Sequence, residues 1–204
     1  MDQSNIELEV KFYISNLDKL ESQLKNLGAK LVQSRTQEYN LRFDTPLGDF
    51  ALGYRVLRLR QDNAIRLTYK GPGEIKNGVR SRQEIEIIVD DFDQAQTLLE
   101  ALGYQISMVY EKYRMGYELD GVLVTLDELP YGDFVEIEGP DTEGIKNVSA
   151  KLGLKWDARI LESYAILFDV LKNNLDISIE KLTFSDFNGI LVTPDHLGVS
   201  PGDR

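Results

Sequence analysis

The chain has 204 residues, of which 42% are hydrophobic, and it carries a formal net charge of -11. This length fits one domain, or one domain with a tail, and the negative charge argues against nucleic acid or an anionic membrane as the general partner, while leaving room for a local basic cavity. The lack of cysteine excludes a disulfide framework and a thiolate metal site, and a polar N-terminus without any apolar run near about 18 residues predicts a cytoplasmic protein without a membrane span.

An alternation of apolar and charged residues predicts strands along most of the chain. In the first, Ile6–Ile14, every second position from Glu7 to Lys11 is charged and the positions between are apolar. Alternate side chains of a strand point to opposite faces, so one face of this strand is ionic and the other apolar. The same pattern predicts strands at 37–43, 54–61, 64–70, 83–89, 109–118, 122–126 and 134–138. Tight turns are expected at Asp62-Asn63 and Asp120-Gly121, and a looser connection at 71–78.

Four segments have the apolar spacing of amphipathic helices: 17–27, 93–102, 143–152 and 161–171. Each of the first three ends in Leu-Gly, where a helix C-terminus favours a left-handed residue. Each of these three also follows a strand that contains Glu-x-Glu, which suggests a loose internal repeat. The stretch from about Asp176 to Arg204 lacks any such pattern, and the sequence leaves open an extra hairpin, a lid or a mobile tail.

The ordinary interpretation of these strands is an antiparallel sheet with one solvated face. However, the polar positions are almost all ionic, and the helices must cover the apolar face of the sheet. We therefore expect the sheet to curl with its helices outside, so that the charged faces line a cavity. Interleaved carboxylates and cations would partly neutralise one another there.

The mixture of charges in this cavity suits a polyphosphate with divalent metal. Arginine and lysine bind phosphate oxygens, whereas carboxylates would repel phosphate unless cations such as Mg²⁺ or Mn²⁺ lie between them. Cations on one wall and metal-holding acids on the other form an arrangement typical of phosphoryl or nucleotidyl transfer.

An ordered series of motifs runs over residues 5 to 172 and begins with an ExExK signature at Glu7-Leu8-Glu9-Val10-Lys11. It continues with Phe43-Asp44-Thr45-Pro46, Leu57-Arg58-Leu59-Arg60, Leu67-Thr68-Tyr69-Lys70-Gly71-Pro72, Ser81-Arg82-Gln83-Glu84-Ile85-Glu86, Lys112-Tyr113-Arg114, Leu126-Asp127-Glu128-Leu129, Gly132-Asp133-Phe134-Val135-Glu136-Ile137-Glu138-Gly139 and Ser163-Tyr164. The series resembles the triphosphate tunnel metalloenzymes of the CYTH superfamily, which includes class IV adenylyl cyclases and thiamine triphosphatases.

The resemblance implies an α+β fold: an eight-stranded antiparallel closed β-barrel, or tunnel, with helices packed outside. The tunnel domain would span residues 1–174, and 175–204 would be an extension of unknown role. The implied partner is a small-molecule triphosphate, with neither nucleic acid nor membrane, and the family often forms homodimers.

The resemblance also assigns roles to residues. Divalent metal, Mg²⁺ or Mn²⁺, would be held by Glu7, Glu9, Glu136, Glu138 and Asp127. The substrate would be bound by Lys11, Arg58, Arg60, Arg66, Lys70, Arg82, Lys112 and Arg114. Catalytic roles would fall on Lys11, Glu84, Glu86 and Asp127.

Several functions remain open from the sequence. The protein could hydrolyse a triphosphate, which requires only that the polyphosphate be held, or it could be an adenylyl cyclase, in which the ribose 3′-hydroxyl attacks the α-phosphorus of ATP. A non-catalytic polyphosphate or nucleotide binder would keep the cations and lose metal ligands, and a purely structural barrel would hold only buried ion pairs. Hydrolysis is the preferred hypothesis. Arg42 and Arg55 either lie near a tunnel mouth or are ordinary surface cations, and the second interpretation is preferred; Tyr110 is given no role.

Overall fold

One antiparallel sheet contains every strand of the computed structural model, which describes residues 6–204. The strands are β1 (Ile6–Ile14), β2 (Lys30–Asp44), β3 (Val56–Gln61), β4 (Ile65–Lys70), β5 (Glu74–Lys76), β6 (Val79–Val89), β7 (Gln105–Leu119), β8 (Val122–Leu129) and β9 (Gly132–Glu138). Most are longer than the sequence pattern predicts, and β5 lies within the predicted loose connection at 71–78. The predicted turn at Asp120-Gly121 joins β7 to β8, with both residues at positive φ, as a two-residue hairpin turn requires.

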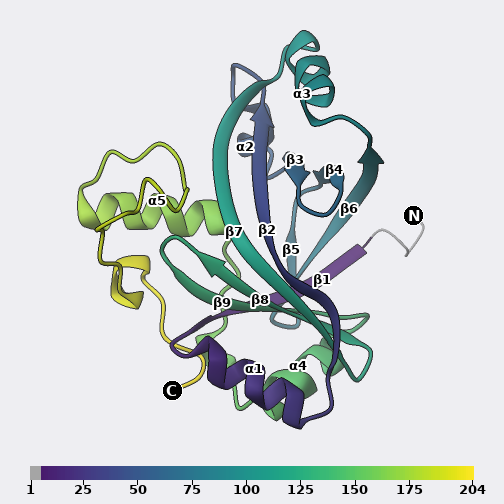
Figure 1. Cartoon of the computed structure of the whole chain (residues 1–204), viewed down its shortest axis with the longest axis vertical. Helices are drawn as coiled ribbons and strands as arrows, with labels where there is room; N and C mark the ends of the chain where they lie inside the picture. Colours follow the sequence, from purple (N-terminus) through teal and green to yellow (C-terminus); the bar gives the residue numbers. More distant parts are fainter. Residues whose placement is uncertain (1–5) are drawn as a thin grey trace.

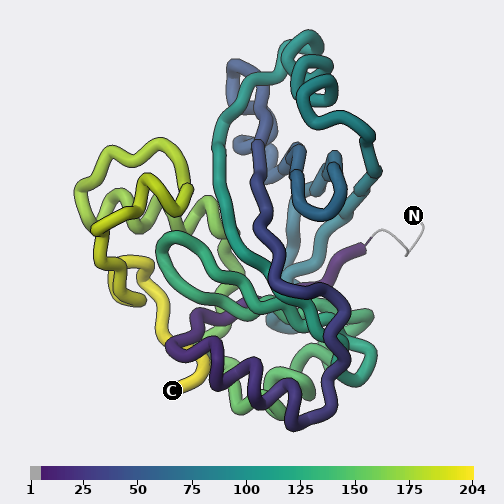
Figure 2. Tube along the Cα trace, viewed as in Figure 1, coloured from purple at the N-terminus to yellow at the C-terminus, as the bar shows by residue number. Residues whose placement is uncertain are grey.

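The sheet closes into a barrel. Its strand order is β1-β9-β8-β7-β2-β3-β4-β6-β5, and β1 pairs with β6 as well as with β9. Eight strands therefore form a complete ring, and β5 is a short addition at the edge of β6. The two longest strands, β2 and β7, run side by side along one wall (Figure 2). The predicted eight-stranded closed barrel is confirmed.

The helices lie outside this ring (Figure 1). They are α1 (Leu17–Asn26), α2 (Asp49–Leu52), α3 (Phe92–Ala101), α4 (Thr142–Lys151) and α5 (Tyr164–Leu175), with short 3₁₀ turns η2 (Trp156–Ala158) and η3 (Pro194–Leu197). As the repeat predicts, α1, α3 and α4 each follow a strand with Glu-x-Glu and end in Leu-Gly with the glycine at positive φ. The fourth predicted helix begins three residues late, because Ser163 is its N-cap and accepts a hydrogen bond from the Ile166 N–H.

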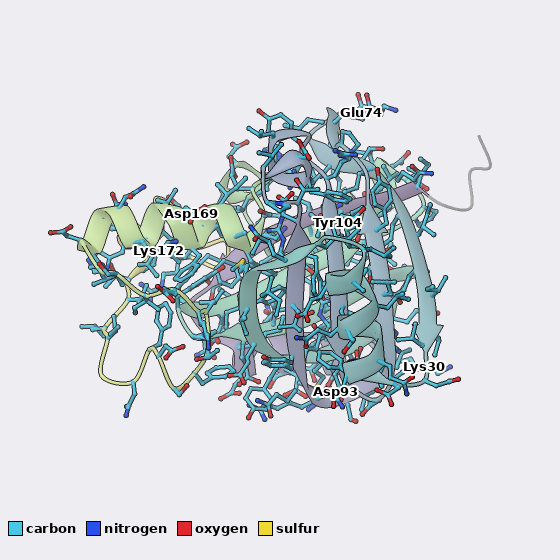
Figure 3. All side chains as sticks on the ribbon, turned by 90° about the horizontal axis from the view of Figure 1, so that it is seen from above. Lys30, Glu74, Asp93, Tyr104, Asp169 and Lys172 are labelled. Carbon is cyan, nitrogen blue, oxygen red and sulfur yellow. The ribbon has the colours of Figure 1, made fainter. Side chains whose placement is uncertain are left out.

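The apolar faces of the strands pack against these helices. Phe12 of β1 and Leu20 and Leu24 of α1 belong to one buried cluster, which α4 also joins through Ile145. A second cluster joins α3 to β2 and β3, and a third contains much of α5. The outer part of α5, which carries Asp169 and Lys172, extends away from the barrel (Figure 3). None of the described helices has the length and apolar character to cross a membrane.

The chain after α5 packs against the barrel wall. Strand β7 pairs with β8 only from Tyr113 onward, and Leu182 forms backbone hydrogen bonds with Val109 and Glu111 on the part of β7 that β8 leaves uncovered. The C-terminus returns to the start of α1 (Figure 2), where the Asp203 carboxylate accepts hydrogen bonds from the Ser15 and Asn16 N–H groups. Leu182 also belongs to the apolar cluster that contains α5. The segment is thus an ordered part of the wall.

Asp133 provides a pH-dependent test of the fold. Burial and the nearby carboxylates of Glu128 and Asp18 raise the pKa of Asp133 from 3.8 to about 6. Because the folded pKa is above the unfolded value, the protonated form stabilises the fold below about pH 4, and this contribution is lost as the pH rises through about 6. We expect Asp133→Asn to raise the melting temperature relative to wild type more at pH 8 than at pH 4. Thermal unfolding of both proteins at the two pH values checks this, and an equal difference at both would contradict it.

Candidate active site

All eight strands of the ring contribute side chains to one cavity of about 590 Å³. Its charged lining consists of Glu7, Glu9, Lys11, Glu38, Arg42, Arg58, Arg60, Asp62, Arg66, Lys70, Arg82, Glu84, Glu86, Lys112, Arg114, Glu136 and Glu138. The charged sides of the strands therefore face one another inside the barrel, as the alternation predicts. Every candidate metal, substrate or catalytic residue from the sequence lies in this lining except Asp127, while the roles assigned to them stay predictions.

The first group of carboxylates lies on neighbouring strands β1 and β9. The Glu7 carboxylate accepts hydrogen bonds from Lys70 at 2.7 Å and from Arg82 at 3.0 Å, and Arg82 also donates to Glu9 at 3.2 Å. Glu138 lies directly opposite Glu9 in the strand register. Although Glu138 is exposed to the cavity, the surrounding protein and the charge of Glu7, followed by Glu84 and Glu9, raise its pKa to about 7. This end of the cavity therefore has more negative charge than its cations compensate.

A hard divalent cation fits the donor chemistry of this group. Within residues 6–204, no three acidic or histidine side chains converge into a ready metal site, and Lys70 and Arg82 form ion pairs with Glu7 and Glu9. Burial and then the repulsion from neighbouring carboxylates raise the pKa of Glu138, and a bound Mg²⁺ or Mn²⁺ with carboxylate ligands would relieve that repulsion. Glu9 and Glu138 could hold such an ion together with phosphate oxygens.

A second group of charges centres on Asp127, which is 0% exposed. Its carboxylate accepts hydrogen bonds from Lys112 at 2.9 Å, from Arg114 at 2.6 Å and from the Tyr164 hydroxyl at 2.9 Å. Arg114 also pairs with Glu136. Asp127 does not line the cavity, so the structure gives no support to it as a metal ligand. Its geometry fits a positioning role, in which it fixes the two cations that face the cavity.

Tyr164 brings the N-terminus of α5 to this group. Its ring lies 5.2 Å from the Lys11 Nζ and 5.4 Å from the Lys112 Nζ, measured to the ring centroid. Burial, followed by the negative charges of Asp127 and Glu136, raises the pKa of Tyr164 well above its ordinary value. The hydroxyl therefore keeps its proton and remains a hydrogen-bond donor to Asp127.

Comparison with known proteins identifies this arrangement. The family model described as "CYTH domain" matches residues 5–155. The chain belongs to the CYTH family.

Two curated CYTH relatives are similar to most of the chain. A protein of Methanocaldococcus jannaschii, named as a candidate adenylate cyclase, is 31% identical over 135 residues, which is 65% of this chain and 76% of that protein. The adenylate cyclase CyaB of Aeromonas hydrophila is 27% identical over 192 residues, which is 88% of this chain and 96% of that protein.

Solved structures agree with the CYTH fold. A candidate adenylate cyclase of Vibrio parahaemolyticus has a TM-score of 0.73 at 22% identity, covering 81% of this chain and 98% of that one. An adenylyl cyclase candidate from Hippeastrum, described as having a dominant triphosphatase activity, has a TM-score of 0.63 at 20% identity, covering 80% of this chain and 95% of that one. At these identities the likeness concerns the fold.

Sequence reasoning missed several residues in the cavity of this CYTH domain. Glu38 is 0% exposed and faces Arg60, Lys112 and Arg114. Burial alone would raise its pKa, but these cations, Lys112 first, outweigh burial and lower the pKa to about 2. The signal was present, since Glu38, Asn40 and Arg42 alternate with the apolar Leu41 on β2.

The expectation that Arg42 is a surface cation is wrong, because Arg42 lines the cavity. Arg55 lies outside the cavity lining, where it donates a hydrogen bond to the Asp49 carbonyl and stacks on Phe50. Tyr110 also lines the cavity, although its place in the sequence suggested no role. The face of a strand on which a residue lies was therefore the decisive signal for Arg42.

Proposed function

We propose that this CYTH protein hydrolyses inorganic or organic triphosphates, such as tripolyphosphate, thiamine triphosphate or a nucleoside triphosphate, with the help of a divalent metal. The observation that carries this proposal is the enclosed cavity in which cations from six strands alternate with carboxylates. So many buried charges are costly to maintain without a ligand to neutralise them. A linear polyphosphate has the charge and the slender shape to do so.

The cationic and the acidic residues of the cavity would bind different parts of the substrate complex. Arg60, Lys70 and Lys112 would bind the oxygens of the phosphate chain, since arginine and lysine are the usual donors to phosphate. Glu7, Glu9, Glu136 and Glu138 would hold Mg²⁺ or Mn²⁺, which supplies charge neutralisation and a more acidic water when bound.

Glu86 would orient the attacking water. Its carboxylate accepts hydrogen bonds from Thr68 at 2.9 Å and from Arg60 at 3.2 Å. These contacts fix the carboxylate at the cavity surface, where it could accept a hydrogen bond from water in line with a phosphorus atom. Glu84, which lies 3.1 Å from Lys70, would assist in the same way.

Adenylyl cyclase activity is the second candidate. The names of the Methanocaldococcus and Aeromonas relatives favour it, and the same cavity could place the α-phosphorus of ATP next to its own ribose hydroxyl. Hydrolysis requires less of the site than cyclisation does, because only the polyphosphate has to be bound. In the Hippeastrum protein, which shares this fold, a dominant triphosphatase activity is described under a cyclase name, and function follows the site rather than the fold.

A product assay separates these candidates. The protein is incubated with Mg²⁺ or Mn²⁺ and with tripolyphosphate, thiamine triphosphate or ATP, and the products are separated by ion-exchange chromatography. Orthophosphate supports hydrolysis, and cyclic AMP with pyrophosphate supports the cyclase. Tight binding without any product would support a non-catalytic binder and overturn the proposal.

Lys70→Ala is expected to weaken substrate binding more than it slows the chemical step. The Lys70 ammonium lies among Glu7 and Glu84 and faces the cavity, so its loss removes a donor to the phosphate chain. We expect KM for tripolyphosphate to rise about tenfold or more, the cost of one hydrogen bond to a charged group, while kcat changes less. Lys151→Ala, at a surface pair with Asp120, is the matched control. A fall in kcat with an unchanged KM would contradict this assignment.

A further inference from the structure

Two arginines of the cavity lie directly opposite each other. Arg42 of β2 is the register partner of Arg58 of β3, and both side chains line the cavity. Like charges directly opposite on neighbouring strands destabilise a sheet. This pair therefore costs free energy in the empty barrel, and an anion between the two guanidinium groups would remove that cost.

Arg42 also lacks the carboxylate partner that the other cavity cations have, and Arg58 has only a distant one. Within residues 6–204, the Arg42 side chain forms neither an ion pair nor a hydrogen bond, whereas every other cation of the lining lies within ion-pair distance of a carboxylate. Arg58 has one such contact, at 3.8 Å from Glu86, and its Nε is buried without a hydrogen-bond partner. Arg42 is thus the cation with the least compensated charge in the described lining, whereas Tyr110, Glu38 and Glu84 outweigh burial and raise the pKa of Arg58.

The pKa values of Arg42 and Tyr110 are both lowered, and the positive charge around them contributes to this. Burial lowers the pKa of Arg42, and repulsion from Arg82 and Arg58 lowers it further, against the influence of Tyr110 and the Asp44 carboxylate. Burial alone would raise the pKa of Tyr110, but Arg58 and Lys112 outweigh burial and lower it. The Tyr110 hydroxyl lies 3.5 Å from Arg58, and it could donate to an oxygen held by the arginines.

We propose that Arg42 and Arg58 bind the terminal phosphate group of a triphosphate and thereby fix the direction in which the chain lies in the barrel. A terminal phosphate offers three free oxygens and a second negative charge, and it suits two guanidinium forks better than an internal phosphate does. The organic group of a substrate then lies at the opposite end of the chain. This assignment rests on the proposed function for its substrate class.

Calorimetric binding of tripolyphosphate, without metal, tests the site independently of turnover. We expect Arg42→Leu to weaken binding by about 10- to 100-fold, the range for a charge-assisted hydrogen bond, and to leave the melting temperature of the free protein equal or higher. Arg42→Gln should bind with similar weakness, and it serves if the leucine variant does not fold. Arg55→Leu is the matched control, because Arg55 lies outside the cavity lining, and it should bind as wild type does.

The outcomes separate the two proposals. Wild-type protein that binds neither tripolyphosphate nor ATP, with or without Mg²⁺ or Mn²⁺, would overturn the proposed function. Wild-type binding that both Arg42 variants retain would overturn the assignment of Arg42 alone.

A second comparison tests whether the bound group is terminal. ATP is compared with an analogue whose γ-phosphate carries a methyl ester, which removes one charge and one free oxygen from that group. Arg42→Leu should weaken ATP binding by at least about tenfold, and the loss should be clearly smaller for the ester. An equal loss for both ligands would place an internal phosphate at the arginine pair and overturn the assigned direction.

Discussion

Replacing Glu9 with glutamine is expected to slow the release of orthophosphate from tripolyphosphate by about a hundredfold or more, since even the residues behind metal ligands affect metal affinity or activity by about 10- to 100-fold. Only 6% of the surface of Glu9 is exposed. Glu9 is the register partner of Glu138 and lies near Glu7 on β1. The amide keeps the size of the side chain and can still accept a hydrogen bond from Arg82, but it removes the charge that a divalent cation requires.

The fold should survive this substitution. Removing one of three neighbouring carboxylates also relieves the repulsion that adds to burial in raising the pKa of Glu138, so we expect the midpoint of urea unfolding to stay equal or to rise. Glu118→Gln, at an exposed position on β7, is the control and should leave the rate unchanged. A Glu9→Gln variant with the normal rate in Mn²⁺ would show that the metal assignment on β1 is wrong.

Asp127→Asn is expected to destabilise the fold by about 3–5 kcal/mol, the cost of removing one partner from a buried ion pair. Asp127 is fully buried and accepts hydrogen bonds from Lys112, Arg114 and Tyr164. Asparagine has nearly the same shape, but it leaves two buried cations with less negative charge near them. Urea unfolding gives the free energy of unfolding directly.

Asp169→Asn is the matched control for this prediction. Asp169 forms a surface ion pair with Lys172 on the outer part of α5 (Figure 3), and its side chain is 66% exposed. Exposed pairs of this kind contribute about 0–1 kcal/mol, so this variant should unfold close to wild type. If the free energy of unfolding fell by the same small amount in both variants, Asp127 would not hold the cation network together.

The sequence predicted the barrel because one alternation carries two kinds of information. Apolar residues on β1, such as Val10 and Phe12, point outward to α1 and α4, and the charged residues between them point inward. Four helices that need an apolar surface and strands that are ionic on the other face leave few arrangements besides a closed sheet. The comparisons and the structure agree with that prediction.

The same alternation cannot show how deeply a side chain is buried or which groups it contacts. Asp127 lies on the correct strand, but three donors enclose its carboxylate and keep it from the cavity surface. Arg42 follows the alternation of Glu38 and Asn40, yet a single arginine beside apolar residues is also typical of a surface strand. Only the structure, which places Arg42 in the cavity lining, distinguishes the two possibilities.

The position of the C-terminal segment could not be predicted for a different reason. It has no periodic pattern, since its place depends on the unequal lengths of β7 and β8. Where β8 ends, the β7 backbone at Val109 and Glu111 needs a partner, and Leu182 supplies it. That requirement is visible only after both strands have been placed.

The closed ring of strands has a consequence for what can enter. Widening the barrel would break the hydrogen bonds between neighbouring strands, and sheets held on both sides resist such opening. A molecule that binds in the cavity must therefore enter at an end of the barrel rather than between strands, so that its cross-section rather than its length decides whether it fits. A slim chain of linked phosphates satisfies this condition, and a bulky ring bearing phosphates around its rim does not.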